Sequence, residues 1–176
     1  MIQIISLLIV LIFFLFFVSS INYEHFTTAE RVYKLNKNSF LFNKEKITID
    51  TANLSVTPSN FKIVKKSDLI YNLVSGENQA TIHLQFSKDP VNIIVNNHQY
   101  NILFKQSKKD ENVYNMFLYG KVCGNLRKDG DTLIVKNTRD EINSAANLVA
   151  IFFAFLMFDE IESAKNTDYD KKFMES

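Results

Sequence analysis

The sequence is poor in the residues that define disulfide-stabilised or strongly charged proteins. It contains one cysteine and no tryptophan among 176 residues. A single cysteine, Cys123, cannot form an intrachain disulfide, which excludes a small disulfide-stapled secreted fold. Charge of one sign is not in excess either, because 20 Lys and Arg residues stand against 19 Asp and Glu residues. This balance gives no reason to expect a nucleic-acid partner, and the length suits a single domain.

Sequence motifs of catalytic centres are also missing. Nothing matches a phosphate-binding loop, a nucleophile elbow or a dinucleotide-binding fingerprint. His25, His83 and His98 are scattered, and no histidine stands close to a cysteine, so metal-ligand spacing does not occur. We expect Cys123, within "KVCGNL", to lie in a strand as a small hydrophobic residue. The sequence therefore predicts a non-enzymatic protein with no cofactor and no metal.

The chain opens with the apolar stretch "MIQIISLLIVLIFFLFFVSS", in which only Ser6 interrupts residues 4–18. About 20 such residues cover the ~30 Å hydrocarbon layer of a bilayer. We predict a transmembrane anchor over residues 1–21, followed by a linker over residues 22–30. The small residues of "VSS" leave a cleaved signal sequence as the alternative, although the basic region of a signal peptide is missing.

The charges that flank this stretch predict its orientation. No Lys or Arg precedes it, whereas Arg31, Lys34 and Lys37 follow it closely. The positive-inside rule then predicts a single-pass membrane protein whose C-terminal domain faces the cytosol. The glycosylation sequon that begins at Asn53 indicates the opposite orientation, but one sequon is expected by chance in a chain so rich in asparagine.

The middle of the chain alternates apolar and polar residues over short segments. In "QATIHLQF", Ala80, Ile82 and Leu84 fall on one face while Thr81 and His83 fall on the other, as in a half-buried strand. Turn-forming residues separate eleven such segments: 31–35, 39–43, 46–50, 61–65, 69–74, 79–86, 91–95, 100–105, 113–119, 121–126 and 132–136. Short connections indicate antiparallel neighbours, and a sheet with this many strands tends to curl or close.

The last periodic segment predicts a helix over residues 139–163. Thr138 and Glu141 have the spacing of a capping box, and residues 164–176 form a polar tail. Only Asn147 is polar between residues 145 and 158, so the helix has no face suited to solvent. We expect a core helix, and the residues that we assign to its packing are Leu148, Ile151, Phe152, Phe155 and Leu156.

These fourteen residues reach about 21 Å, which is too short for a bilayer and close to the height of a five- or six-residue strand. A helix buried on all sides requires strands that surround it. We therefore predict a mainly β protein: a closed antiparallel barrel of about 12 strands over residues 31–163, which encloses the hydrophobic C-terminal helix. A two-span protein, in which residues 145–158 cross lipid, is the alternative.

This combination resembles the tubby C-terminal-like superfamily, which includes the phospholipid scramblases and the LURP-one-related proteins. The local match is "NLVAIFFAFLMFDEI", an apolar helix that ends in an Asp-Glu-Ile triplet. The resemblance implies a twelve-stranded barrel around a central helix. Scramblases, however, carry a proline-rich tail, a palmitoylated cysteine cluster and a C-terminal anchor. This chain has two prolines, one cysteine and an N-terminal apolar stretch, so calcium-dependent lipid scrambling is the least favoured function.

Three basic pairs fall in or beside predicted turns, namely Lys65 with Lys66, Lys108 with Lys109, and Arg127 with Lys128. Tubby domains bind phosphoinositide headgroups through a basic face, so the resemblance makes these residues candidate lipid-binding groups. Near an anionic leaflet each gains about 1 kcal/mol. The alternative is that they are solubilising turn residues.

The sequence thus predicts a membrane-anchored, non-enzymatic domain that binds membrane lipid headgroups or a protein partner at the membrane. The alternative is a structural scaffold protein of a membrane, for instance of a large DNA virus particle, since the excess of Lys over Arg and the many Asn, Ile and Phe residues are typical of AT-rich genomes.

Overall fold

The computed structural model describes residues 30–58, 60–76, 78–85, 92–97 and 99–174. The predicted anchor, most of the predicted linker, His25 and His98 therefore lie outside the described residues. The strands are β1 (Arg31–Asn36), β2 (Ser39–Phe42), β3 (Glu45–Asp50), β4 (Ser55–Thr57), β5 (Lys62–Ser67), β6 (Ile70–Ser75), β7 (Asn78–Gln85), β8 (Asn92–Asn97), β9 (Asn101–Gln106), β10 (Val113–Leu118), β11 (Lys121–Asp129) and β12 (Thr132–Asn137).

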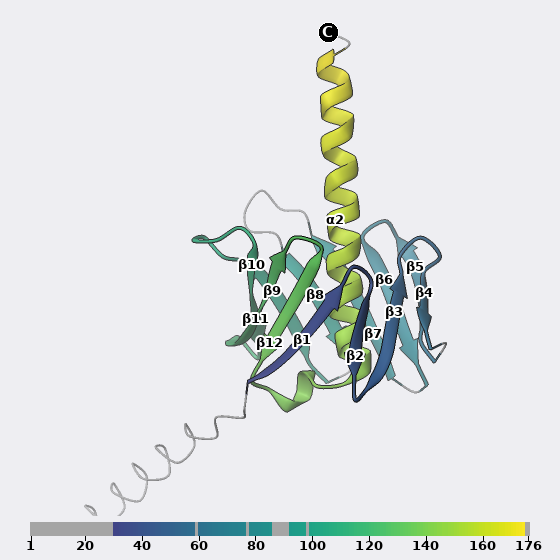
Figure 1. The fold of residues 1–176 in the computed structure, drawn as a ribbon, viewed down its shortest axis with the longest axis vertical. Coiled ribbons are helices and arrows are strands. Elements are labelled where there is room, and N and C mark those ends of the chain that lie inside the picture. The colour runs from purple at the N-terminus through teal and green to yellow at the C-terminus, as the bar shows by residue number, and fades with distance from the viewer. Residues whose placement is uncertain (1–29, 59, 77, 86–91, 98, 175–176) are drawn as a thin grey trace, which may run out of the picture. The chain divides into compact units, whose positions relative to one another are not determined.

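The twelve strands form a closed barrel in which each strand pairs antiparallel with the next (Figure 1). β1 closes the barrel by pairing with β12 over six residue pairs, from Arg31 with Asn137 to Asn36 with Thr132. The eleven predicted strands are all present. The missing twelfth is β4, which has three residues and directly precedes Pro58, so it was too short to display alternation.

The helical part begins later than predicted. A 3₁₀ turn, η1 (Asp140–Ile142), precedes α2 (Ala145–Met174), and the N-cap of α2 is Ser144, whose Oγ accepts the N–H of Asn147 at 3.1 Å. The predicted capping box is therefore wrong, because the Thr138 hydroxyl instead donates to the Cys123 carbonyl at 3.1 Å. The reason is geometric: the chain must first cross from β12 in the wall to the barrel axis.

The end of the helix also differs from the prediction. α2 continues to Met174, beyond the predicted end at residue 163, so most of the predicted polar tail is helical. Residues 159–174 contain no glycine or proline to stop the helix.

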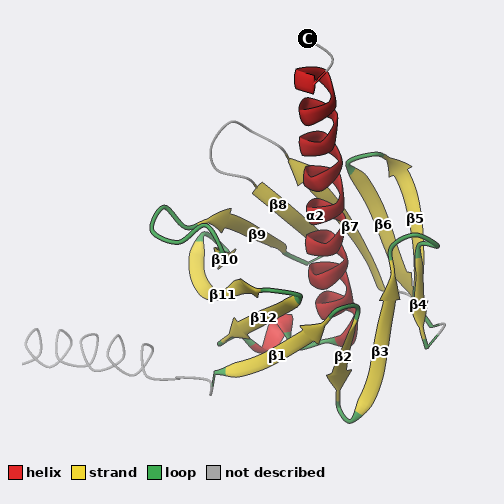
Figure 2. Ribbon diagram, turned by 45° about the horizontal axis from the view of Figure 1, so that its top comes forward, coloured by secondary structure: helices red, strands yellow, loops and turns green. Residues whose placement is uncertain are grey.

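α2 fills the barrel, and the strands surround it (Figure 2). Leu148, Ile151, Phe152 and Phe155 are 0% exposed, as predicted, whereas Leu156 is only partly buried against the core. Val149, Ala150, Phe153 and Ala154 are also 0% exposed, so the helix is buried on every side rather than along one stripe. Within the described part of the chain, no helix is both long and apolar enough to cross a membrane.

The two ends of the barrel have different structures. At the first end, which we name the base, odd-numbered strands begin and the 138–144 connection leads from β12 to α2. At the other end, which we name the exit end, the hairpins that follow the odd-numbered strands surround the point where α2 leaves the barrel (Figure 1). This difference decides where each candidate residue lies.

Candidate functional site

The exit end holds all six basic residues predicted from the sequence. Lys65 and Lys66 end β5, the pair of Lys108 and Lys109 lies in the β9–β10 connection, and Arg127 and Lys128 stand near the end of β11. The fold thus brings the three pairs to one rim. They do not form one patch, because β5 and the β9–β11 region stand apart in the strand order of the barrel.

Two of the six cations already have acidic partners. Lys65 pairs with Asp68 at 2.7 Å, with both side chains largely exposed. This ion pair raises the pKa of Lys65 and lowers that of Asp68, chiefly through their shared hydrogen bond.

Lys128 pairs with Asp159 of α2, and its side chain is only 18% exposed. The Lys128 Nζ also lies 5.4 Å from the ring centroids of Tyr114 and Phe158. Cation–π contacts of this kind stabilise a partly desolvated ammonium group. Lys128 therefore fastens the helix to the wall, a role that the sequence did not indicate.

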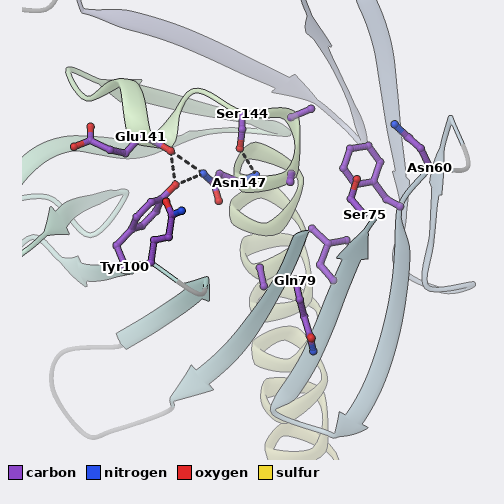
Figure 3. A pocket seen from close by; sticks show the side chains of 13 residues that line it. Asn60, Ser75, Gln79, Tyr100, Glu141, Ser144 and Asn147 are labelled. Carbon is purple, nitrogen blue, oxygen red and sulfur yellow. Dashed lines mark hydrogen bonds between the residues drawn. The ribbon is translucent and has the colours of Figure 1, made fainter. Parts of the chain in front are cut away.

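The base contains a cavity of about 530 Å³ between the first turn of α2 and the β5–β7 side of the wall (Figure 3). Its volume is in the range of small-molecule sites. The buried side chains Phe61, Leu73 and Ala80 form its apolar wall, together with Ala145 and Ala146 of the helix. The remaining lining residues are polar: Asn60, Ser75, Gln79, Gln99, Tyr100, Glu141, Ser144 and Asn147.

Asn147 organises the inner edge of this cavity. Its side chain is 5% exposed, and its Nδ2 donates to the Tyr100 hydroxyl at 2.6 Å and to the Glu141 carbonyl at 2.8 Å. The Tyr100 hydroxyl in turn donates to the same carbonyl. Figure 3 shows these three groups meeting beside the helix, with the Glu141 carboxylate directed away from them. The arrangement fixes Tyr100, which comes from the β8–β9 connection, against the start of α2.

The chemistry of the cavity is that of recognition by hydrogen bonds. Its described lining residues include neutral amides and hydroxyls, and among these described residues there is no Lys, Arg, His or Cys and the only carboxylate is that of Glu141. Neutral amides can donate and accept at once, so they suit a ligand with hydroxyl, amide or carbonyl groups. Apolar atoms on the facing wall suit the aliphatic part of such a ligand.

Cys123 lies elsewhere, buried in β11 as predicted from the sequence. Its Sγ contacts the Met116 carbonyl at 3.4 Å. Burial raises the pKa of the thiol to about 11, so it stays protonated at neutral pH and is a poor nucleophile. His83 lies on β7 with its side chain on the outer face, since Ile82 and Leu84 point into the core.

Among the described residues, no group of three or more His, Cys, Asp or Glu side chains is placed to hold a metal ion. One residue of the sequence points to the cavity. Asn147 is the single polar residue between residues 145 and 158, and a buried amide in an apolar helix needs hydrogen-bonding partners.

No protein-family model, curated protein or solved structure matches the chain. The resemblance to the tubby C-terminal-like superfamily therefore stays a prediction.

Proposed function

We propose that the protein is a non-enzymatic binding module, held at a membrane by its N-terminal apolar segment, that binds a lipid headgroup in the base cavity. One observation carries the proposal: the cavity at the end of the barrel where β1 begins combines a buried apolar wall with neutral amides and hydroxyls.

The exit end is less suited to a flat bilayer. From Phe158, which is 1% exposed, α2 continues to Met174, a rise of about 24 Å at 1.5 Å per residue. This projecting helix would hold a flat membrane away from Lys66, Lys108 and Lys109. The six basic residues are therefore, in this proposal, surface groups rather than the lipid-binding site.

The lining of the cavity indicates the class of headgroup. Among the described residues that line it, none carries a positive charge, so the described lining offers a polyanionic phosphoinositide no cation. Hydroxyl-rich or zwitterionic headgroups can hydrogen-bond with Gln79, Gln99 and Ser75 while the first part of an acyl chain contacts Phe61 and Leu73.

The test uses the full chain in a polyoxyethylene detergent with three short-chain lipids: a glycosyl diacylglycerol, a phosphatidylcholine and a phosphoinositide. Titration calorimetry should detect binding of the first or second and no preference for the third. Ser75→Phe, which places a ring in the cavity, should weaken binding about tenfold or more. The matched control is Val74→Phe, because the neighbouring side chain on β6 points outward and is not part of the lining.

Two results would overturn the proposal. One is equal binding by both variants. The other is a preference for the phosphoinositide that disappears in a Lys108→Ala/Lys109→Ala variant, which would return the site to the exit end. Binding to a protein partner, a scaffold role and lipid scrambling remain predictions from the sequence.

A further inference from the structure

The barrel wall has a weak seam between its first two strands. β1 pairs with β12 over six residue pairs, but it pairs with β2 only at Asn36 and Ser39, next to their hairpin. Figure 2 shows the two strands diverging from this hairpin toward the base. β2 forms four residue pairs with β3 on its other side. The seam therefore separates two strands that each pair with another neighbour, β1 with β12 and β2 with β3.

This divergence leaves a groove of about 580 Å³ on the outside of the barrel. Tyr33 and Phe40, which point toward the core, form its floor. Val32 and Leu41 stand on opposite sides of it and are 46% and 65% exposed, respectively. Exposed aliphatic side chains on both sides of a groove favour an occupant with apolar groups.

The backbone of β1 is also available along this groove. In a strand, alternate N–H and C=O groups point to the two neighbouring strands, and those of residues 31–35 that face β2 have no partner in the barrel ladder. Such an edge is a template for an added strand, and five residues of it extend over about 17 Å. Main-chain hydrogen bonds at an exposed edge are the basis of peptide recognition by β-strand addition.

The charges of the groove select the partner. Lys34 of β1 and Lys46 of β3 line it, both exposed, and none of the described lining residues is acidic. Among the described residues, neither lysine takes part in an ion pair. An extended segment with outward acidic side chains would pair with both lysines, while its inward side chains would contact Tyr33 and Phe40.

We propose that this groove binds an extended segment of a partner protein, in which apolar and acidic residues alternate and whose backbone pairs with the free edge of β1. The site is separate from the base cavity, and it does not depend on lipid binding there.

The test uses the full chain in detergent and synthetic eight-residue peptides. One peptide alternates valine with glutamate, and its comparison alternates valine with lysine. The glutamate peptide should bind at least about tenfold more tightly, and Lys34→Glu/Lys46→Glu should reverse this preference. Lys62→Glu/Lys121→Glu, which makes the same charge change on exposed residues outside the groove, should leave it unaltered.

Backbone methylation distinguishes strand addition from simple charge attraction. Methylating the amides along one edge of the glutamate peptide should abolish binding, whereas methylating those along the other edge should change it by less than about threefold. The proposal is overturned if both methylated peptides bind like the parent, or if no peptide binds at millimolar concentration. A dimer of the chain alone that dissociates in Lys34→Glu/Lys46→Glu would assign the groove to a second copy and would also overturn it.

Discussion

Because α2 is enclosed on all sides, substitutions on opposite faces of this helix should both destabilise the protein, whereas a surface helix has one tolerant face. Phe153 and Phe155 are separated by about 200° around the helix, so their side chains point in nearly opposite directions. Both are 0% exposed. Phe153 packs edge-on against Tyr71 with ring centroids 5.2 Å apart, and Phe155 packs in the same way against Phe104 at 5.1 Å. Replacing either phenylalanine with alanine should therefore be severely destabilising.

The expected loss is about 4 kcal/mol of unfolding free energy for each variant. Phe→Ala in a core costs roughly 3–5 kcal/mol because a cavity replaces the ring, and the lost edge-to-face contacts keep these two sites away from the lower end of that range. For a domain of this size, 1 kcal/mol corresponds to roughly 2–4 °C in Tm, so each variant should melt about 8–16 °C lower. Leu156→Ala is the control, since that side chain is only partly buried, and it should cost about 1–2 kcal/mol.

Thermal unfolding of the full chain in detergent, followed by circular dichroism, measures these differences. The decisive comparison is between Phe153→Ala and Phe155→Ala. If one of them melted like the wild-type protein, one face of α2 would not be in the core, and the reasoning from an enclosing barrel would fail. A loss in Leu156→Ala as large as in the other two would contradict the burial pattern.

Three further predictions concern the wall and its contacts with the helix. Gly124→Ala should lower the free energy of unfolding by about 3 kcal/mol, because a Cβ there would meet a β12 carbonyl oxygen at 2.0 Å. A Cβ at Gly76 meets no atom within 4 Å, so Gly76→Ala should cost only about 1–2 kcal/mol, through the positive φ of that residue. Thermal melts compare the two variants. Burial raises the pKa of Cys123 from 9.0 to about 11, so its neutral thiol stabilises the fold below pH 9, and this contribution is lost between pH 9 and 11. Urea titrations over this pH range should show a smaller loss of unfolding free energy in Cys123→Ala than in the wild-type protein. A double-mutant cycle with Lys128→Met and Asp159→Asn should give a coupling free energy of about 1 kcal/mol, and a value near zero would contradict the fastening role of this ion pair.

The architecture was predictable because its strands and its core helix have different patterns in the sequence. Period-two segments such as residues 79–86 could only be half-buried strands, and the run without a polar face at residues 145–158 required a surrounding wall. The boundaries of the helix were not predictable in the same way. Thr138 and Glu141 satisfy the capping-box pattern locally, but the position of the barrel axis, which depends on the whole sheet, decides that Ser144 caps the helix.

The cavity and the seam could not be derived from local pattern at all. The cavity takes its lining from five separate parts of the chain, and only the closed barrel brings the 60–61 segment beside the first turn of α2. The seam lies between two short segments that are both typical of strands, and neither segment indicates that their pairing ends beyond Asn36 and Ser39. For the basic pairs, the position beside turns could be read from the sequence, and these turns lie at one end of the barrel. Their ion pairs with Asp68 and Asp159 could not be predicted, because only the fold brings these carboxylates to Lys65 and Lys128.

The 138–144 connection contacts the wall near β1 and also lines part of the base cavity. This connection enters from β12, places the side chain of Ile142 in the core at 0% exposure, and brings Asn143 within 3.1 Å of both the Tyr33 hydroxyl and Asn137 Nδ2. It therefore fills the base beside β1 and β12, behind the weak seam. The cavity lies on the other side, where Glu141 and Ser144 of the same connection line it together with residues of β6 and β7 and of the β4–β5 and β8–β9 connections. Because the same seven residues support the seam and border the cavity, a substitution that loosens them, such as Ile142→Ala, should affect binding at both sites, whereas Ser75→Phe should affect only the cavity.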